Sequence, residues 1–235
     1  MYFIIKKNTK VFIAVLLVVI VAVAFAVRLM TKSYSYAISD QNRTVVLDAG
    51  HGGVDGGASS HDGALEKDIN LAILLKLKTL LVLNGYDVIT TRETDISIHD
   101  EDSDTIRRKK VSDMKKRLQI TDDASGIFVS IHQNQFPNEK YSGAQMFFGM
   151  NNPQSPRLAD CIQSSFAKTL QKNNKREIKK ATKSLFLLYQ TKVPAVIVEC
   201  GFMSNPKEAD LLQQDEYQKK LAIVIFNGIS EYYKG

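Results

Sequence analysis

The chain has 235 residues, of which 44% are hydrophobic and 24% charged, with 13 glycines and only 5 prolines. This composition excludes a disordered or collagen-like chain and suits one well-cored domain with a small appended segment. The formal net charge is +6, but five of the 31 basic residues and none of the 25 acidic residues lie within residues 1–32. The remainder therefore carries 26 basic against 25 acidic residues, so no basic footprint for a nucleic acid is expected on the folded part.

An unbroken apolar run of 17 residues extends from Val11 to Val27, with three lysines before it and Arg28 and Lys32 after it. As a helix rising about 1.5 Å per residue it would span roughly 25 Å, the short end of the range for a membrane span. An uncleaved anchor is favoured. The alternatives are a cleaved secretory signal, with Ala24-Phe25-Ala26 as its cleavage site, and a helix buried in the globular fold.

The anchor and the cleaved signal both place the body of the protein outside the cytoplasm, because the lysine-rich end stays in the cytoplasm. We assign residues 1–32 to a signal anchor and the polar, aperiodic residues 33–42 to a linker. Residues 43–235 then form a single domain.

Within this domain, short apolar runs alternate with helical stretches. In chain order we predict a strand at 44–47, a helix at 66–83 closed by Asn84-Gly85, a strand at 86–91, a charged helix at 104–123, strands at 126–131 and 143–148, a helix capped by Ser155 and opened by Pro156 that runs to about residue 173, a strand at 195–198, and a helix from about residue 216 to the end. This order predicts an α/β fold, a three-layer sandwich with a mixed, largely parallel central sheet flanked by helices.

The stretch from Asp95 to Arg117 is acidic at its start and basic along the helix. Such an arrangement agrees with the helix dipole, so a solvated helix is the favoured interpretation and a surface that docks a partner or the cell wall is the alternative. For Cys161 and Cys200, two buried free thiols are favoured over a disulfide, and a nucleophilic Cys200 is disfavoured because its base would be a histidine needed elsewhere.

Two of the four histidines follow apolar strands. His51 lies in a glycine-dense loop directly after the first strand, and His132 closes the third, whereas His61 and His99 lie in polar loops. In an open α/β sheet, ligands collect beyond the carboxyl ends of the strands, so His51 and His132 are placed where a site forms.

Two acids occupy matching positions. Glu66 begins the long helix, where an acid is also explained as a capping group. Glu199 closes a buried strand, where a charged group is costly unless it is paired or has a role in the chemistry. Two imidazoles and one carboxylate would hold Zn²⁺ and leave a position for water, from which the other carboxylate would take a proton. The spacing alone does not say which glutamate binds the metal. Arg92 and Asn134 would orient these groups or the substrate, or make structural hydrogen bonds.

The glycine loop has a rival interpretation as a phosphate cradle. Asp55 stands where a dinucleotide fingerprint has Gly or Ala, and the chain contains no Gly-Lys-Ser/Thr sequence. Nucleotide binding is therefore disfavoured, and the glycines are expected to let the backbone turn sharply beside the metal.

At this point five ordered motifs, which span about four fifths of the chain, resemble those of the zinc-dependent N-acetylmuramoyl-L-alanine amidases of the third amidase class. They are Val46-Leu-Asp-Ala-Gly-His-Gly-Gly, Glu66-Lys-Asp-Ile-Asn, Thr91-Arg-Glu-Thr-Asp, Val129-Ser-Ile-His-Gln-Asn and Pro194-Ala-Val-Ile-Val-Glu-Cys-Gly-Phe-Met-Ser-Asn. The resemblance implies one Zn²⁺ per chain, held by His51, Glu66 and His132. It implies that Glu199 is the catalytic glutamate, and that residues 43–235 are a zinc amidase catalytic domain.

Within the family the likeness is closer to the germination-specific, spore-cortex amidases of endospore-forming bacteria, through His132-Gln-Asn, the run Ser184-Leu-Phe-Leu-Leu-Tyr and the N-terminal anchor without wall-binding repeats. This implies an enzyme of the forespore envelope that removes stem peptides so that a downstream deacetylase forms muramic δ-lactam. An accessory activating protein is a further expected partner. The sequence departs from the subfamily in Lys180-Ala-Thr-Lys before Ser184, which puts the substrate rim there in doubt.

The implied reaction is hydrolysis of the amide between the lactyl carbonyl of N-acetylmuramic acid and L-alanine in peptidoglycan. Zinc would polarise the carbonyl, and Glu199 would move the proton from water to the departing amine. The alternatives are a catalytically silent, zinc-held peptidoglycan-binding module, a general vegetative cell-wall amidase, and a wall carboxypeptidase or deacetylase.

Overall fold

The computed structural model describes residues 11–28 and 43–235. The chain divides into two compact units, residues 1–42 and 43–235. The predicted linker at 33–42 and the lysine-rich start of the chain lie outside the described residues.

The first unit contains a helix, Val11–Arg28, with a mean hydropathy of 3.0. Its length and composition are sufficient for crossing a membrane, and none of its residues is buried. A signal sequence near the N-terminus has the same properties. The anchor and the cleaved signal therefore remain the two interpretations of this segment.

The second unit is built on a six-stranded sheet with the order β2-β1-β3-β6-β4-β5. The strands are β1 (Thr44–Ala49), β2 (Asp87–Thr90), β3 (Ile127–Asn134), β4 (Gln145–Phe148), β5 (Lys179–Lys180) and β6 (Ala195–Phe202). All neighbouring strands pair in parallel except β4 and β6, which are antiparallel. The predicted mixed, largely parallel sheet is confirmed.

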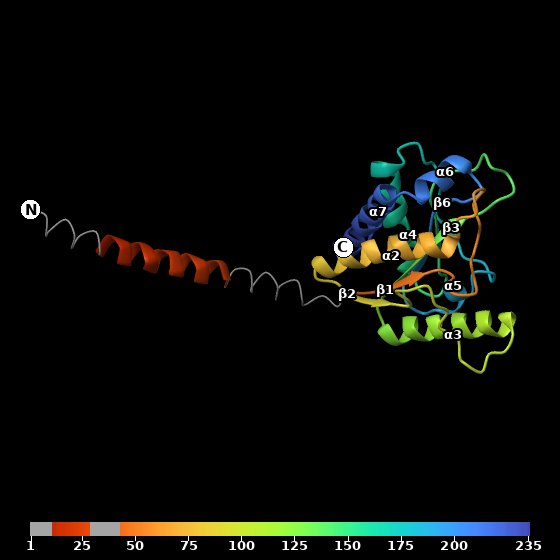
Figure 1. Cartoon of the computed structure of the whole chain (residues 1–235), viewed down its shortest axis with the longest axis horizontal. Helices are drawn as coiled ribbons and strands as arrows, with labels where there is room; N and C mark the ends of the chain where they lie inside the picture. The colour runs from red at the N-terminus through yellow and green to blue at the C-terminus, as the bar shows by residue number, and fades with distance from the viewer. Residues whose placement is uncertain (1–10, 29–42) are drawn as a thin grey trace, which may run out of the picture. The chain divides into compact units, whose positions relative to one another are not determined.

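Helices cover both faces of the sheet (Figure 1). They are α2 (Glu66–Leu83), α3 (Ile106–Ala124), α4 (Ser155–Ser165), the π-helical turn η1 (Phe166–Leu170), α5 (Phe186–Gln190), α6 (Pro206–Leu212) and α7 (Asp215–Tyr233). The helices α2, α4 and α7 pack on one face, and α3 and α5 on the other. The three-layer α/β sandwich is therefore confirmed.

The strand β1, between β2 and β3, is buried along its whole length. Because alternate side chains of a strand point to opposite faces, Val45 and Leu47 join the apolar core under α2, α4 and α7, whereas Val46 joins a second core under α3 and α5. Asp48 shares the face of Val46, so a carboxylate is buried beneath α3.

This buried carboxylate is fully partnered. Asp48 accepts hydrogen bonds from Arg117 Nη1 at 2.5 Å, Thr91 Oγ1 at 2.7 Å and Ser130 Oγ at 2.5 Å, and Arg117 Nε donates to Asp113 Oδ2 at 2.6 Å. Burial alone would raise the pKa of Asp48, but the Arg117 guanidinium and the hydroxyl donors lower it to about 2. Arg117 and Asp113 are themselves buried.

This network qualifies the favoured interpretation of the charged stretch as a solvated helix. The residues Asp113, Arg117 and Thr121 are spaced four apart on one face of α3, and all three are buried. That face turns inward and supplies the cation that pairs with Asp48, while most of the other charged residues of the helix are exposed.

The ends of two predicted helices also differ from the structure. Ser155 does not cap α4, because the N-cap is Gln154, and Ser155 Oγ instead accepts a hydrogen bond from Ala195 N at 3.0 Å. The helix expected to run to about residue 173 becomes π-helical at Phe166 and ends at Leu170. The predicted stop of α2 is confirmed, with Asn84 as the C-cap and Gly85 at φ +79°.

The two ends of the second unit lie side by side. Tyr233 at the end of α7 donates a hydrogen bond from its hydroxyl to the carbonyl of Thr44 at 2.9 Å. Thr44 is the first residue of β1. The end of α7 is thus hydrogen-bonded to the start of β1.

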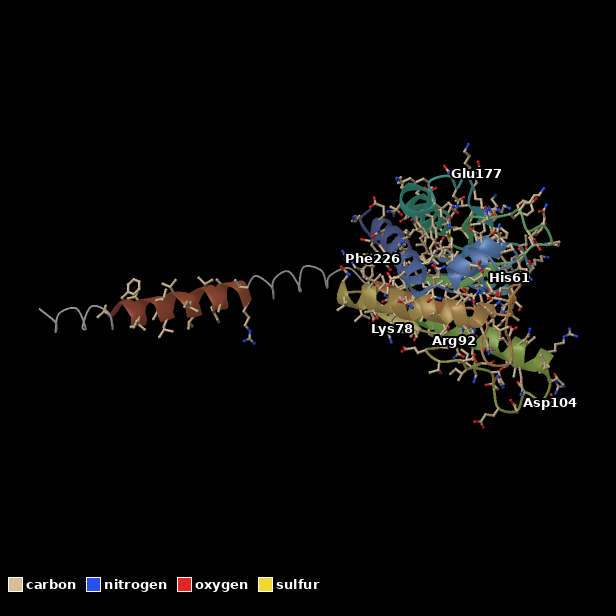
Figure 2. All side chains as sticks on the ribbon, turned by 45° about the horizontal axis from the view of Figure 1, so that its top comes forward. His61, Lys78, Arg92, Asp104, Glu177 and Phe226 are labelled. Carbon is tan, nitrogen blue, oxygen red and sulfur yellow. The ribbon has the colours of Figure 1, made fainter. Side chains whose placement is uncertain are left out.

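Replacing Arg117 with Met should destabilise the fold by about 3–5 kcal/mol, because Asp48 and Asp113 would remain buried without their cation. The control is Arg108→Met on the same helix, whose partner Asp104 is 66% exposed and lies at the periphery (Figure 2), and which should change stability by less than about 1 kcal/mol. Urea unfolding of both variants measures the difference. Equal effects would contradict a stabilising role for the buried network.

Asp48 should also give the fold a specific sensitivity to acid. Its pKa in the folded state, about 2, lies below the ordinary value of 3.8, so the unfolded chain binds the proton first. The contribution of this group, of the order of 2 kcal/mol, is nearly complete above about pH 5 and is lost progressively as the pH falls toward 1. The difference in unfolding free energy between the wild type and Asp48→Asn should therefore narrow over that interval. A constant difference from pH 6 to pH 2 would contradict it.

Candidate metal centre and active site

Four residues that the sequence singled out come together at one edge of the sheet. His51 directly follows β1, while His132 and Glu199 lie in β3 and β6 as register partners on adjacent parallel strands. Glu66 is the first residue of α2. The parallel order β1-β3-β6 brings these strand ends side by side, as expected for a site beyond the carboxyl ends of the strands.

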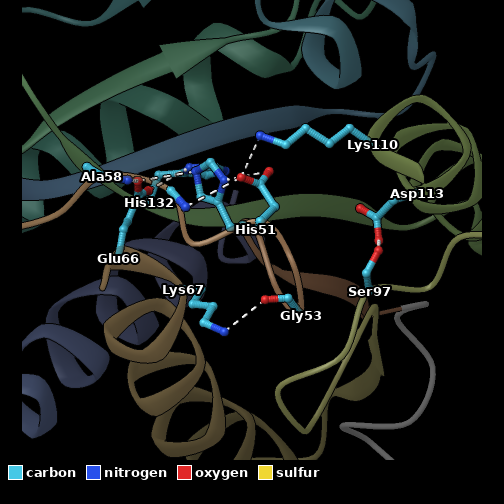
Figure 3. A network of polar contacts seen from close by, with 12 residues as sticks. His51, Gly53, Ala58, Glu66, Lys67, Ser97, Lys110, Asp113 and His132 are labelled. Atoms are coloured by element: carbon cyan, nitrogen blue, oxygen red, sulfur yellow. Dashed lines mark hydrogen bonds and ion pairs between the residues drawn. The ribbon is translucent and has the colours of Figure 1, made fainter. Parts of the chain in front are cut away.

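The side chains of His51, Glu66 and His132 converge (Figure 3), each offering a ligand atom within 4.8 Å of the others. Glu66 bridges the histidines, with Oε2 at 3.2 Å from His51 Nε2 and Oε1 at 3.0 Å from His132 Nδ1. The two imidazole rings meet edge to face, with their centroids 5.0 Å apart. Two imidazoles and a carboxylate are a donor set that suits Zn²⁺.

The Glu66 carboxylate is buried and held from several directions. Its Oε1 accepts hydrogen bonds from Asn70 Nδ2 at 3.2 Å and Gln133 N at 3.0 Å, and its Oε2 accepts one from Ala58 N at 2.9 Å. Burial by itself would raise the pKa of Glu66, but hydrogen bonds to the two histidines bring it well below its ordinary range. The group is therefore ionised and fixed in orientation.

The histidines respond in the opposite direction. Burial would lower the pKa of His51, but its bonds to Asp55 and Glu66 raise it to about 9. The pKa of His132 is also raised, by Glu66, against the effect of burial. A cation entering this cluster therefore competes with protons for the same lone pairs.

The backbone at His51 is held by two buried arginines. His51 has φ +64°, which is unusual for a residue with a side chain, and Arg117 Nη2 donates to its carbonyl at 2.8 Å. Arg92 donates to the carbonyls of Ala49 at 2.9 Å and Gly50 at 3.1 Å. Arg92 thus has a structural role at the backbone that leads into His51. Asn134 contributes its backbone carbonyl, which accepts from Met203 N at 2.7 Å.

Two glycines allow this close packing. A Cβ on Gly50 would lie 2.1 Å from the His132 ring, and a Cβ on Gly57 would lie 2.6 Å from Glu66 Oε2. Gly57 also has φ +69°. Both positions need glycine, which supports the expectation that the glycine loop brings its backbone close to the site.

Glu199 differs from Glu66 in its surroundings. Its Oε2 is buried and has no hydrogen-bond partner within the described part of the chain. Burial raises the pKa of Glu199 to about 7, with nearby Glu66 adding to the rise and His132 opposing it. The carboxyl is thus poised to gain or lose a proton near neutral pH.

A cavity of about 250 Å³ opens beside the two histidines. It is lined by the glycine loop, by α3 through Lys110, and by Ser184 to Leu187 from the run that the resemblance singled out. In the segment 180–183, where the sequence departs from the subfamily, Lys180, Thr182 and Lys183 are exposed. The rim beside the histidines is therefore formed by residues 184–187.

The other candidates lie apart from the cluster. His61 pairs with Asp210 at 3.7 Å, and His99 bonds to Ser97 Oγ at 2.8 Å. Cys161 and Cys200 are free thiols, as expected, although Cys161 is only half-buried. Burial raises the pKa of Cys200, which disfavours a thiolate nucleophile.

Sequence reasoning overlooked three residues near His51. Asp55 Oδ2 lies 3.0 Å from His51 Nδ1, Lys110 Nζ lies 2.8 Å from Asp55 Oδ1, and Arg117 holds the His51 carbonyl. The only local signals were the spacing of four between His51 and Asp55 and the spacing of four between Asp113 and Arg117.

Comparisons with known proteins agree with this geometry. The family described as N-acetylmuramoyl-L-alanine amidase matches residues 45–231. The chain is 33% identical over 203 residues to the germination-specific N-acetylmuramoyl-L-alanine amidase of Bacillus subtilis, covering 86% of this chain and 84% of that protein. It is 29% identical over 237 residues to the amidase AmiA of Escherichia coli, covering 83% and 78% of the two chains.

Solved structures give the same result. The CwlD amidase from Clostridioides difficile, in complex with the GerS lipoprotein, matches with a TM-score of 0.78 and 43% identity over 82% of this chain and 99% of that one. The catalytic domain of CwlV from Bacillus (Paenibacillus) polymyxa matches with a TM-score of 0.70 and 28% identity, over 82% and 98%. From its motifs, fold and relatives, this chain belongs to the N-acetylmuramoyl-L-alanine amidase family.

Proposed function

We propose that the protein is a zinc-dependent amidase that hydrolyses the bond between the lactyl carbonyl of N-acetylmuramic acid and L-alanine in peptidoglycan. The observation that carries this proposal is the convergence of His51, Glu66 and His132 beside Glu199, whose Oε2 is buried and has no hydrogen-bond partner in the described part of the chain. Glu66 is fixed by several hydrogen bonds and Glu199 is not, which supports separate tasks for the two acids.

His51, Glu66 and His132 would hold one Zn²⁺. The donor set is that of a catalytic rather than a closed structural site, because three protein ligands leave a fourth position open. The bound metal would supply a lowered pKa for water and polarisation of the substrate carbonyl. The hydrogen bonds that Asn70, Gln133 and Ala58 make to Glu66 orient its carboxylate before any ion arrives.

Glu199 would be the general base and acid. With a pKa raised to about 7, its carboxylate accepts the proton of the attacking water and returns it to the departing L-alanine amine. Its position in β6 beside His132 in β3, and an Oε2 with no hydrogen-bond partner among the described residues, support this role. The cavity beside His51 and His132 would receive the part of the muramyl peptide nearest the bond to be cut.

The proposed biological role is removal of stem peptides during formation of the spore cortex, so that a downstream deacetylase can form muramic δ-lactam. The likeness to the germination-specific amidase of B. subtilis and to CwlD of C. difficile supports it. CwlD was solved together with the GerS lipoprotein, which supports an accessory protein for this chain as well. The helix Val11–Arg28 would anchor or export the domain into the forespore envelope.

Replacing Glu199 with Gln should leave zinc content unchanged and lower turnover by about 10²- to 10⁴-fold, because the proton acceptor is lost but no ligand is removed. The full-length protein in detergent is assayed on purified peptidoglycan, with mass spectrometry of stem peptides that carry a free N-terminal L-alanine. Glu177→Gln, an exposed glutamate, serves as the control. Near-wild-type turnover in the Glu199 variant, or release of D-alanine or acetate instead of stem peptides, would contradict the proposal.

Replacing His51 or His132 with Ala should abolish stoichiometric zinc binding, since each removes one of three ligands. Zinc content after exhaustive dialysis is measured by atomic emission. The matched control is His61→Ala, which lies in an exposed loop and should retain the metal. Full zinc occupancy in either ligand variant would remove that histidine from the proposed site.

A further inference from the structure

Asp55 lies between the glycine loop and α3 and contacts a charged group on each side. Its Oδ2 is 3.0 Å from His51 Nδ1, and its Oδ1 accepts from Lys110 Nζ at 2.8 Å. Figure 3 shows Lys110 reaching from its helix toward the cluster that contains His51. One carboxylate oxygen of Asp55 thus contacts His51, and the other accepts from Lys110 and, at 3.5 Å, from Gly57 N.

The loop fixes the backbone of Asp55. Gly52 N donates to the Asp55 carbonyl at 2.9 Å, and Asp55 N donates to the Gly52 carbonyl at 3.1 Å. These two bonds close a tight turn immediately after His51. The Asp55 carboxylate therefore returns beside the His51 ring through local geometry and needs no mobile segment.

The helix α3 holds His51 at two points. Arg117 donates to the His51 carbonyl at 2.8 Å, and Lys110, two turns earlier on the same helix, holds the carboxylate that contacts the His51 ring. The main chain and the side chain of His51 are thus both positioned by α3, whereas Glu66 belongs to α2 on the other face of the sheet.

The chemistry of this contact is directional. An ionised carboxylate only accepts hydrogen bonds, so His51 Nδ1 must carry the proton that it shares with Asp55. The lone pair that remains for a metal is then on Nε2, the atom that lies 3.2 Å from Glu66 Oε2. A carboxylate that fixes a histidine in this way sets both its tautomer and its ring orientation.

We propose that Asp55 is a positioning residue that fixes the metal-binding tautomer of His51, and that Lys110 orients the Asp55 carboxylate by binding the oxygen that does not face the ring. This inference rests on the proposed role of His51 as a zinc ligand. It adds to that role an orienting carboxylate and a lysine on α3.

The chain contains a matched control for a merely structural acid. Asp95 accepts from Gly53 N at 2.8 Å and from Lys67 Nζ at 2.6 Å, so it also joins a lysine to the glycine loop. Within the described part of the chain, Asp95 makes no hydrogen bond or ion pair with a histidine. Loss of Asp95 therefore tests loop support without the contact to His51.

The first experiment measures zinc affinity of the full-length protein in detergent, by competition with a chromophoric chelator. Asp55→Ala should weaken zinc binding by about 10- to 100-fold, and Asp95→Ala should stay within about 2-fold of wild type. In parallel, long-range ¹H–¹⁵N correlation spectra of the zinc-loaded protein should show the proton of His51 on Nδ1. Equal affinities of Asp55→Ala and wild type, or a proton-free Nδ1, would overturn the proposal.

The second experiment tests Lys110. Asp55→Asn leaves one acceptor oxygen, which Lys110 attracts, so the amide NH₂ should face His51 Nδ1 and favour the wrong tautomer. This variant should therefore lose zinc affinity to a similar extent as Asp55→Ala. When Lys110→Met is added to Asp55→Asn, at least half of the lost zinc affinity, on a logarithmic scale, should return. When Lys110→Met is added to Asp55→Ala, none of the lost zinc affinity should return. Identical effects in both backgrounds would refute the part assigned to Lys110.

A His51→Ala arm separates the two proposals. If it binds zinc as tightly as wild type, the proposed metal centre itself is wrong. If it loses zinc while Asp55→Ala does not, the metal centre stands and the positioning role of Asp55 is refuted. Circular dichroism of each variant verifies that the comparison is made between folded proteins.

Discussion

The parallel pairing of β1, β3 and β6 constrains where every charged group of the site lies. Parallel strands end at the same edge, so the residue after β1 and the register partners His132 and Glu199 meet there. The crossover helix α2 then begins at that edge and contributes Glu66 from its first turn. Four polar groups from distant parts of the chain thus converge because of strand direction, and the packing of the faces keeps the edge in place.

The two faces of the sheet contribute differently. Under α2, α4 and α7 the core is apolar and stabilises through burial of hydrophobic surface. Under α3 it contains Asp48 and Arg117, whose charges cost stability unless they remain paired. That pair is also the support for His51, since Arg117 holds its carbonyl. The face under α3, where burial of charge is costly, therefore positions the site. The apolar face under α2, α4 and α7 supplies most of the hydrophobic stabilisation.

Local patterns predicted the layers, the strand order in the chain and the grouping of four site residues, because apolar periodicity and strand ends are visible in sequence. They did not separate the roles of Glu66 and Glu199, which the family resemblance assigned. They also explained the charges of α3 mainly by exposure to solvent and used Ser155 as a cap. In both cases a partner distant in the sequence decided the outcome. Arg117 is buried because it pairs with Asp48, and the Ser155 hydroxyl accepts a hydrogen bond from the backbone N–H of Ala195. Such pairings are set by tertiary structure and leave little trace in a single sequence.

The hydrogen bond from Tyr233 to Thr44 has a mechanical consequence. The strand that begins at Thr44 is the one to which the preceding segment of the chain is attached, and it is paired with β2 on one side and β3 on the other. The start of β1 is therefore joined to two neighbouring strands and to the last helix at the same time. Separation of this end of the strand from the sheet requires α7 to move as well, so the two ends of the domain loosen together or not at all.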